Sequence, residues 1–181
     1  MIPGRKIFTT IVYCKIKNFT AVTECLQEEA MVFLNKISHI VHECAAHWGG
    51  YVDKNLGDSI ILTFTTKEEL KSAQGVDQQE DPDKNEELLE NRSEMSNRAL
   101  IAVIKILSEI RRAQDLMVYS KHPKIVGRLG GSYRLELSFG IHYGWAVQGA
   151  YGSDYKVDAG HISPHIEVAK RFDDLTSDYG C

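Results

Sequence analysis

Six charged side chains are of types that could take part in binding or catalysis: Lys15, Lys54, Asp58, Asp158, Glu167 and Arg171. Carboxylates bind divalent cations. Lysine and arginine donate to anionic oxygens, and the planar fork of arginine suits phosphate. A site built from these residue types would bind an anionic ligand, provided that the fold brings the six side chains together.

Lys54 and Asp58 lie close to a predicted turn. Tyr51 to Asn55 and Ser59 to Phe64 have the residue types of strands, and the short link that contains Gly57 predicts a hairpin between them. Asp58 then stands at the edge of a strand, four residues after Lys54. Taken by itself, a lysine in a hairpin can also simply face solvent.

The other strand signals come from β-branched, aromatic and alternating apolar residues. Ile7 to Tyr13 is β-branched and aromatic, and Tyr133 to Ile141 alternates apolar with polar residues, so both segments are expected to be strands. The glycines in Gly144 to Gly149 predict a turn followed by a hairpin partner. The order of strands and helices predicts an α+β fold, in which helices cover one face of a mainly antiparallel sheet.

Apolar residues recur at three and four residues over two long segments, from Thr23 to about His47 and from Leu100 to about Leu116. This is the period of an amphipathic helix. A last helix is expected over Pro164 to Leu175, because proline is tolerated in a first turn. It carries Glu167 and Arg171 one turn apart. An arginine in such a place can also be an ordinary surface residue.

An acidic stretch separates the first half of the chain from the second long helix. Between Gly75 and Met95 there are eight acidic and two basic residues, with little apolar content. Such a segment offers few groups whose burial would offset its ordering entropy. We expect a mobile acidic insertion over residues 75–95, either as a solvated loop or as a docking site for a basic partner.

The overall composition is that of one globular domain. A chain of 181 residues with 43% hydrophobic and 25% charged residues can bury a core. The net charge of -4 and the pI near 6.0 argue against a nucleic-acid partner. The longest apolar stretches, Ile60 to Phe64 and Ala99 to Leu107, are far shorter than the ~20 residues that cross a bilayer. We therefore expect a single domain over residues 1–181 without a membrane span.

Cysteine and histidine usage gives no sign of a metal or disulfide framework. The four cysteines form no Cys-x-x-Cys pair and no secretory signal is present, which indicates reduced thiols and a cytoplasmic location. His142 and His161 have no partner at a ligand spacing, so we expect no metal or acid–base role for either. The domain is expected to be truncated at its C-terminus or to be a piece of a larger protein, membrane-anchored or part of a large assembly.

Three stretches resemble the catalytic domains of class III nucleotide cyclases, which make cyclic AMP or cyclic GMP. Residues 12–20, Val-Tyr-Cys-Lys-Ile-Lys-Asn-Phe-Thr, are similar to a family strand that ends in a metal-binding aspartate followed by Ile-x-x-Phe-Thr. Residues 49–59, Gly-Gly-Tyr-Val-Asp-Lys-Asn-Leu-Gly-Asp-Ser, closely resemble the family hairpin Gly-Gly…Lys-x-x-Gly-Asp. The hairpin match is the most specific of the three, and its spacing favours a binding role for Lys54.

The third stretch lies in the last quarter of the chain. Residues 139–149, 151–153 and 166–171, together with Asp158, are similar to the family's Gly-Ile-His-x-Gly, Gly-x-Gly-Ser, aspartate and Val-Asn-x-Ala-x-Arg elements. Residues 158–166 look most like the cyclase domains of protists, although two extra residues separate Asp158 from the helix. The matches cover most of residues 7–180 and imply a ferredoxin-like, class III cyclase fold, which usually continues through further strands.

The resemblance implies a damaged metal site. Cyclisation joins the 3′-hydroxyl of a nucleoside triphosphate to its own α-phosphate, assisted in the family by two Mg²⁺ or Mn²⁺ ions on two carboxylates. Asp58 matches one of these carboxylates, and Lys15 occupies the position of the other. At ~4 Å, two like unit charges repel by about 4 kcal/mol at an effective dielectric constant of 20. We expect Mg²⁺ or Mn²⁺ only together with bound nucleotide.

The resemblance also assigns nucleotide contacts. Lys54 and Asp158 match the two positions that read the base, and a cationic donor with a carboxylate acceptor suits adenine and therefore ATP over GTP. Arg171 matches the arginine that stabilises charge in the transition state. Glu167 stands where the family has an asparagine that orients the ribose, and a carboxylate there would repel phosphate oxygens.

In active members of the family the site lies between two cyclase domains. This chain matches more of the half that binds nucleotide than of the half that binds metal. We therefore expect a cyclase homology domain that is weak or inactive alone and forms a homo- or heterodimer with another cyclase domain, as a regulatory or structural half. Two alternatives remain open: an active adenylate cyclase with a heterodimeric site, and a purely architectural domain of a large assembly.

Overall fold

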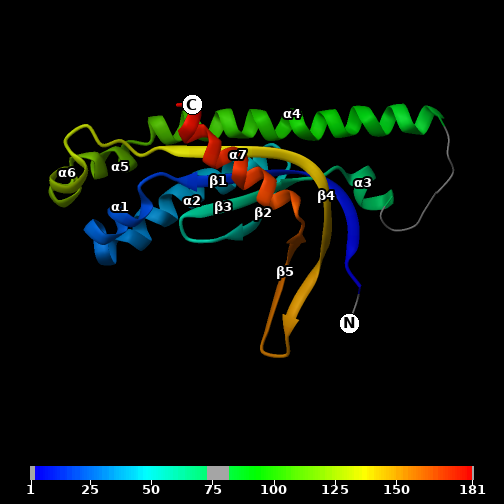
Figure 1. Ribbon diagram of the computed structural model, residues 1–181, viewed down its shortest axis with the longest axis horizontal. Helices are drawn as coiled ribbons and strands as arrows, with labels where there is room; N and C mark the ends of the chain where they lie inside the picture. Colours follow the sequence, from blue (N-terminus) through cyan, green and yellow to red (C-terminus); the bar gives the residue numbers. More distant parts are fainter. Residues whose placement is uncertain (1–2, 73–81, 181) are drawn as a thin grey trace.

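One five-stranded antiparallel sheet forms the centre of the computed structural model, which describes residues 3–72 and 82–180. The strand order is β2-β3-β1-β4-β5. The strands are β1 Arg5–Ile16, β2 Gly50–Asn55, β3 Ser59–Phe64, β4 Leu137–Ser153 and β5 Lys156–Ile162. Figure 1 shows that β4 bends along its length, so that its second half and β5 leave the body of the domain as a projecting hairpin.

Helices lie on both faces of this sheet (Figure 1). The α-helices are α1 Phe19–Leu26, α2 Ala30–His47, α3 Lys67–Ser72, α4 Pro82–Arg112, α5 Gln114–Met117, α6 Pro123–Leu129 and α7 His165–Tyr179. Short 3₁₀ turns span Gln27–Glu29 and Val118–Lys121. No helix among residues 3–72 and 82–180 is long and apolar enough to cross a membrane.

The main core lies between the sheet and α1, α2 and α4. Alternate residues of β1, among them Val12 and Cys14, point to this side and meet Phe33 of α2. Buried residues of α4 such as Ala102 and Ile106 complete the layer. The predictions that the four strand segments share one sheet, and that the two long helices cover the same face, are confirmed.

α7 covers the opposite face and lies very close to it, so the prediction that helices cover one face of the sheet is wrong for this helix. Ile11 and Tyr13 of β1 pack with Ile61 of β3 and with Ala169 of α7. The approach depends on Gly140 of β4, because a Cβ there would overlap the carbonyl oxygen of Ala169. The helix that carries Glu167 and Arg171 is thereby fixed against the centre of the sheet.

Several element boundaries differ from the sequence prediction, among them the start of β4, which lies at Leu137 and not at Tyr133. The helix expected from Thr23 to His47 is broken at Gln27, which has a positive φ of 53° and separates α1 from α2. The turn expected in Gly144 to Gly149 is wrong, because β4 runs on to Ser153 and the chain reverses only there. Gly144 serves close packing instead: a Cβ on it would collide with the ring of His165.

The acidic segment also differs from the prediction in part. Residues 75–81 of the expected insertion lie outside the described residues, whereas from Pro82 the chain is already helix α4. The Arg92 guanidinium lies 4.6 Å from the centre of the Phe8 ring. Met95 is buried, and its sulfur accepts the backbone N–H of Thr66 at 3.2 Å. The expectation of a segment without packing contacts is therefore wrong for its last residues, which the helical period turns toward the sheet.

Candidate functional site

Lys15 points to the face of the sheet that α7 covers. It stands near the end of β1, opposite Ser59 of β3 and Ser138 of β4. Its Nζ donates a hydrogen bond to Oδ1 of Asp174 on α7, at 3.2 Å, and forms an ion pair with it. This hydrogen bond raises the pKa of Lys15 above its ordinary value. The ammonium group is therefore charged and held beside α7.

Asp58 lines the same pocket as Lys15. The pocket has a volume of about 500 Å³ and lies at the ends of β1 and β4, beside α1 and the C-terminal half of α7. One carboxylate oxygen of Asp58 accepts a hydrogen bond from Ser59 Oγ at 3.0 Å, and that hydroxyl accepts one from Tyr13 Oη at 3.0 Å. The structure thus brings together the two residues that match the metal positions.

Two aspartates of α7 complete this pocket and were missed from the sequence. Asp174 binds Lys15, while Asp173 is 1% exposed and faces the sheet. Burial raises the pKa of Asp173, and its hydrogen bond with Ser138 works in the opposite direction. A signal for Asp173 was present, because it follows Ile166 and Ala169 at the spacing of the apolar face of a helix.

The residues of this pocket do not fit a two-ion metal centre supplied by this chain alone. Asp58 matches one metal-binding position of the family motif, and Lys15, whose ammonium group pairs with Asp174, matches the other. Among residues 3–72 and 82–180, no group of three or more His, Cys, Asp and Glu side chains is arranged to hold a metal ion. The acidic residues near Lys15 neutralise its charge rather than surround an empty cation position.

Lys54 and Asp158 are each neighbours of Tyr151, on the projecting hairpin. The Lys54 Nζ lies 5.2 Å from the centre of the Tyr151 ring. Asp158 of β5 is paired with Tyr151 of β4 in the sheet, and its Oδ2 lies 3.3 Å from Nζ of Lys156. The structure therefore brings the two expected base-reading residues into one neighbourhood, with the tyrosine ring between their elements.

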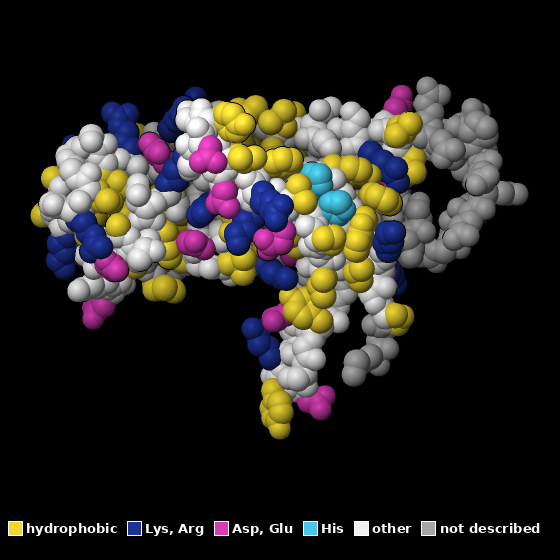
Figure 2. Space-filling view, in the orientation of Figure 1, with side chains coloured by type: hydrophobic (Ala, Val, Ile, Leu, Met, Phe, Trp, Pro, Cys, Tyr) yellow, Lys and Arg dark blue, Asp and Glu magenta, His cyan; other side chains and the backbone are white. Residues whose placement is uncertain are grey.

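Glu167 and Arg171 lie one helical turn apart on the exposed side of α7. Neither lines the pocket of Lys15 and Asp58. Figure 2 shows acidic and basic side chains mixed over this part of the molecule, with apolar side chains along the bend of β4 and on the projecting hairpin. The exposed apolar residues of the hairpin are Tyr151, Tyr155, Val157 and Ile162.

The two histidines expected to be isolated both have partners. His142 of β4 and His165 at the start of α7 are stacked, with 2.9 Å between Nε2 of the first and Nδ1 of the second. Burial lowers the pKa of His142, and the neighbouring His165 lowers it further. His161 of β5 contacts Asp53 of β2. Both contacts depend on the folded sheet and have no signature in sequence spacing.

Comparison with known proteins identifies the fold. No family model matches the chain. The chain is 24% identical over 173 residues to an adenylate cyclase of Anabaena cylindrica, a match that covers 95% of this chain and 28% of that protein. It therefore spans less than a third of the length of this relative.

Solved structures of cyclases superpose on nearly the whole chain. A bacterial light-regulated adenylyl cyclase has a TM-score of 0.70 and 21% identity, covering 98% of this chain and 42% of its own. The adenylyl cyclase CyaB from P. aeruginosa gives 0.68 and 19%, with 96% and 74% covered. The guanylate cyclase domain of RhGC from Catenaria anguillulae, in complex with GTP, gives 0.66 and 16%, with 94% and 75% covered.

The chain therefore has the α+β fold of class III nucleotide cyclase domains, as the sequence predicted. The resemblance to adenylate and guanylate cyclase catalytic domains that its motifs suggested is confirmed.

Proposed function

We propose that this chain is a cyclase homology domain that has little or no activity alone and pairs with a second cyclase domain. The observation that supports this proposal is the ion pair of Lys15 with Asp174, because it holds an ammonium group at the residue that matches a metal-binding aspartate of the family motif. A divalent ion beside Asp58 would have to overcome this charge. The chain alone is thus a poor source of the two ions that cyclisation needs.

The proposal assigns the chain the nucleotide-binding half of a shared site. Lys54 and Asp158 would read the base, with Tyr151 between them, and Arg171 would stabilise charge on the phosphates. The partner domain would supply both metal carboxylates, with Mg²⁺ or Mn²⁺ bound there together with ATP. The exposed apolar side chains of the β4–β5 hairpin support pairing, because monomers rarely leave such groups together in water.

Glu167 weakens nucleotide binding by this chain's half of the shared site. A carboxylate at the ribose-orienting position repels the triphosphate and donates no hydrogen bond. We therefore infer that the chain acts as a regulatory or structural half whose nucleotide affinity is low. An active adenylate cyclase with a heterodimeric site and a purely architectural domain are the two alternatives.

A mixing experiment tests the proposal. The partner is a cyclase domain with both metal carboxylates whose own transition-state arginine has been replaced by alanine, so that only a hybrid site can react. We expect the isolated chain to give background cyclic AMP and the mixture to give only weak activity, which Arg171→Ala in this chain removes. An ordinary family rate from the mixture would instead favour the active heterodimeric alternative. An ordinary family rate from the isolated chain would contradict the proposal. A silent mixture that binds no nucleotide would favour the architectural alternative.

A further inference from the structure

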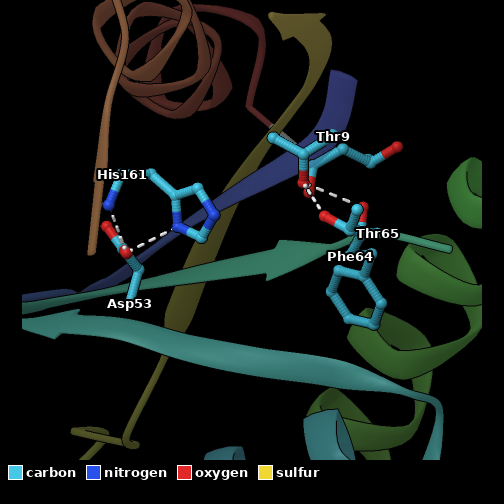
Figure 3. Close-up of polar contacts among 6 residues, drawn as sticks. Thr9, Asp53, Phe64, Thr65 and His161 are labelled. Atoms are coloured by element: carbon cyan, nitrogen blue, oxygen red, sulfur yellow. Dashed lines mark hydrogen bonds and ion pairs between the residues drawn. The ribbon is translucent and has the colours of Figure 1, made fainter. Parts of the chain in front are cut away.

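Asp53 and His161 connect the two edge strands of the sheet. β2 and β5 stand at opposite ends of the strand order, yet Asp53 of β2 meets His161 of β5 (Figure 3). Oδ1 of Asp53 accepts two hydrogen bonds from His161, one from the backbone N–H and one from ring Nδ1, each at 2.8 Å. For the second bond the ring must carry a proton on Nδ1. This side chain pair thus joins the two edges of the sheet.

This contact is buried although it lies beside an exposed hairpin. The Asp53 side chain is 1% exposed and that of His161 is 8% exposed. Their other polar atoms, Oδ2 of Asp53 and Nε2 of His161, are buried without a hydrogen-bond partner in the described part of the chain. Within the described residues, each of the two side chains therefore finds a hydrogen-bond partner only in the other residue. Removing one side chain leaves the other buried without the hydrogen bond between them.

The backbone of β2 and that of β5 both have local features that permit this contact. The pairing of β2 with β3 shifts between Val52 and Lys54, so that Asp53 is an extra residue in a β-bulge. On β5 the neighbouring residue is Gly160, where a Cβ would lie 2.9 Å from Oδ1 of Asp53. A bulge on one strand and a glycine on the other allow the carboxylate to reach the second strand.

The contact also sets the position of the expected base-reading residues. Lys54 follows Asp53 directly, and its Nζ lies over the Tyr151 ring. Asp158 lies three residues before His161 on β5, paired with Tyr151. If β5 separated from β2, Lys54 would lose its position relative to Tyr151 and Asp158, because Lys54 reaches them only across this junction.

We propose that Asp53 and His161 form a positioning clasp, which holds the β4–β5 hairpin against β2 and so keeps Lys54 and Asp158 in register for a purine base. The role in base recognition rests on the proposed function, whereas the clasp itself is a property of the fold. Asp53 and His161 are positioning residues, since they act through Lys54 and Asp158 and not on the ligand.

Amide hydrogen exchange tests the clasp without any nucleotide. We expect Asp53→Ala to speed exchange across residues 156–162 at least about tenfold, while β1 and β3 stay protected. Asp53→Asn, which keeps the acceptor oxygen, should restore most of the protection. Asp154→Ala, on the same hairpin but outside the contact, is the matched control. Unchanged exchange in Asp53→Ala, or an increase spread evenly over the sheet, would overturn the clasp.

His161→Phe gives a second test, since it keeps the bulk of the ring and removes the Nδ1 donor. It should speed exchange over the same residues, and the double variant with Asp53→Ala should be no worse than Asp53→Ala alone, because the carboxylate that accepts the ring hydrogen bond is then already gone. Additive effects would mean that they act separately and would overturn the pair as a unit.

Nucleotide binding separates the clasp from the proposed function. With fluorescent mant-ATP and mant-GTP as probes, we expect Asp53→Ala to lower the preference for the adenine nucleotide several-fold and Asp53→Asn to retain it. If wild type binds neither probe, the proposed function fails while the exchange result still stands. If wild type prefers mant-ATP and Asp53→Ala leaves that preference unchanged, the positioning role is wrong.

Discussion

Lys15 of β1 and Asp174 of α7 form an ion pair across the pocket that contains Asp58, with 3.2 Å between Nζ and Oδ1. The two side chains are 37% and 55% exposed, so the pair contributes at most about 1 kcal/mol to stability. Its importance is chemical, because it fixes a positive charge where the related cyclase motif has a metal-binding carboxylate. The pair also joins the sheet to the helix that carries Glu167 and Arg171.

Close packing of α7 on the sheet predicts a large effect at Gly140. Gly140→Ala would place a methyl group on the carbonyl oxygen of Ala169, and α7 could accept it only by moving away. Overpacking of this kind typically costs about 1–3 kcal/mol. Urea denaturation should show this loss, whereas Gly131→Ala, with no atom within 4 Å of the added carbon, should change stability by less than about 0.5 kcal/mol. Equal effects would show that α7 is loosely held.

Asp173 should make the stability of the domain depend on pH. Burial raises the pKa of Asp173 in the folded state, so the folded protein binds this proton more tightly than the unfolded chain does. Its contribution to stability is then present below the unfolded pKa and is lost as the pH rises through the folded pKa. Asp173→Asn should raise the melting temperature at pH 7, and the gain should shrink below about pH 4, the ordinary pKa of aspartate. Asp178→Asn, exposed on the same helix, is the control. A gain that does not depend on pH would contradict this assignment.

The parts of the molecule that were predictable from sequence are local. The hairpin of β2 and β3 is specified within a few residues by Gly49-Gly50 and Gly57-Asp58, and its strands lie where the sequence placed them. The helical period identified α2 in the same way, and Pro164 marked the start of α7. Lys15 and Asp58 could be assigned to one pocket only through the resemblance to a family.

The contacts that were not predictable join distant parts of the chain. Lys15 and Asp174 are 159 residues apart, and Asp53 and His161 are 108 apart. These pairs form because the sheet curves and α7 packs across it, which no periodicity records. The course of β4 was misjudged for a related reason. Gly144 admits the ring of His165 and Gly149 lies against Gly4, so these glycines serve close packing and do not mark a turn.

The N-terminal part of α4 should be needed for stability, contrary to the expectation for a dispensable insertion. Met95 is 2% exposed and contacts the backbone of Thr66. Met95→Ala should cost about 2–5 kcal/mol, as truncation of a buried methionine usually does. Leu89→Ala, 64% exposed on the same helix, should change stability by less than about 0.5 kcal/mol. Chemical denaturation of the two variants decides between a packed and a solvated segment, and a small effect at Met95 would restore the original expectation.

Restoring the family residues at both altered positions should repair the site. Lys15→Asp removes the fixed ammonium group and places a carboxylate beside Asp58, and Glu167→Asn supplies the amide that orients the ribose. In Lys15→Asp the new carboxylate also joins Asp58, Asp173 and Asp174 in the pocket lining, where Lys17 is the remaining lysine. The variant should therefore be less stable than wild type in EDTA and should regain stability with Mg²⁺ or Mn²⁺, because an ion that binds only the folded state stabilises it. Wild type should show little of this dependence.

Cyclase activity of the double variant is the decisive measurement. Each 1.36 kcal/mol of transition-state stabilisation recovered appears as a tenfold rate increase, so a gain of ten- to a hundredfold over wild type corresponds to about 1.4–2.7 kcal/mol. Adding Arg171→Ala to the double variant should lower the cyclase rate again, because the guanidinium group that would donate to the phosphate oxygens is then absent. Lys15→Ala with Glu167→Asn, which removes the ammonium group without adding a carboxylate, should gain less than the aspartate variant. If the double variant gains a metal-dependent melting temperature yet makes no cyclic nucleotide, the metal position is repaired and the defect lies in the nucleotide-binding half, at Lys54, Asp158 or Arg171.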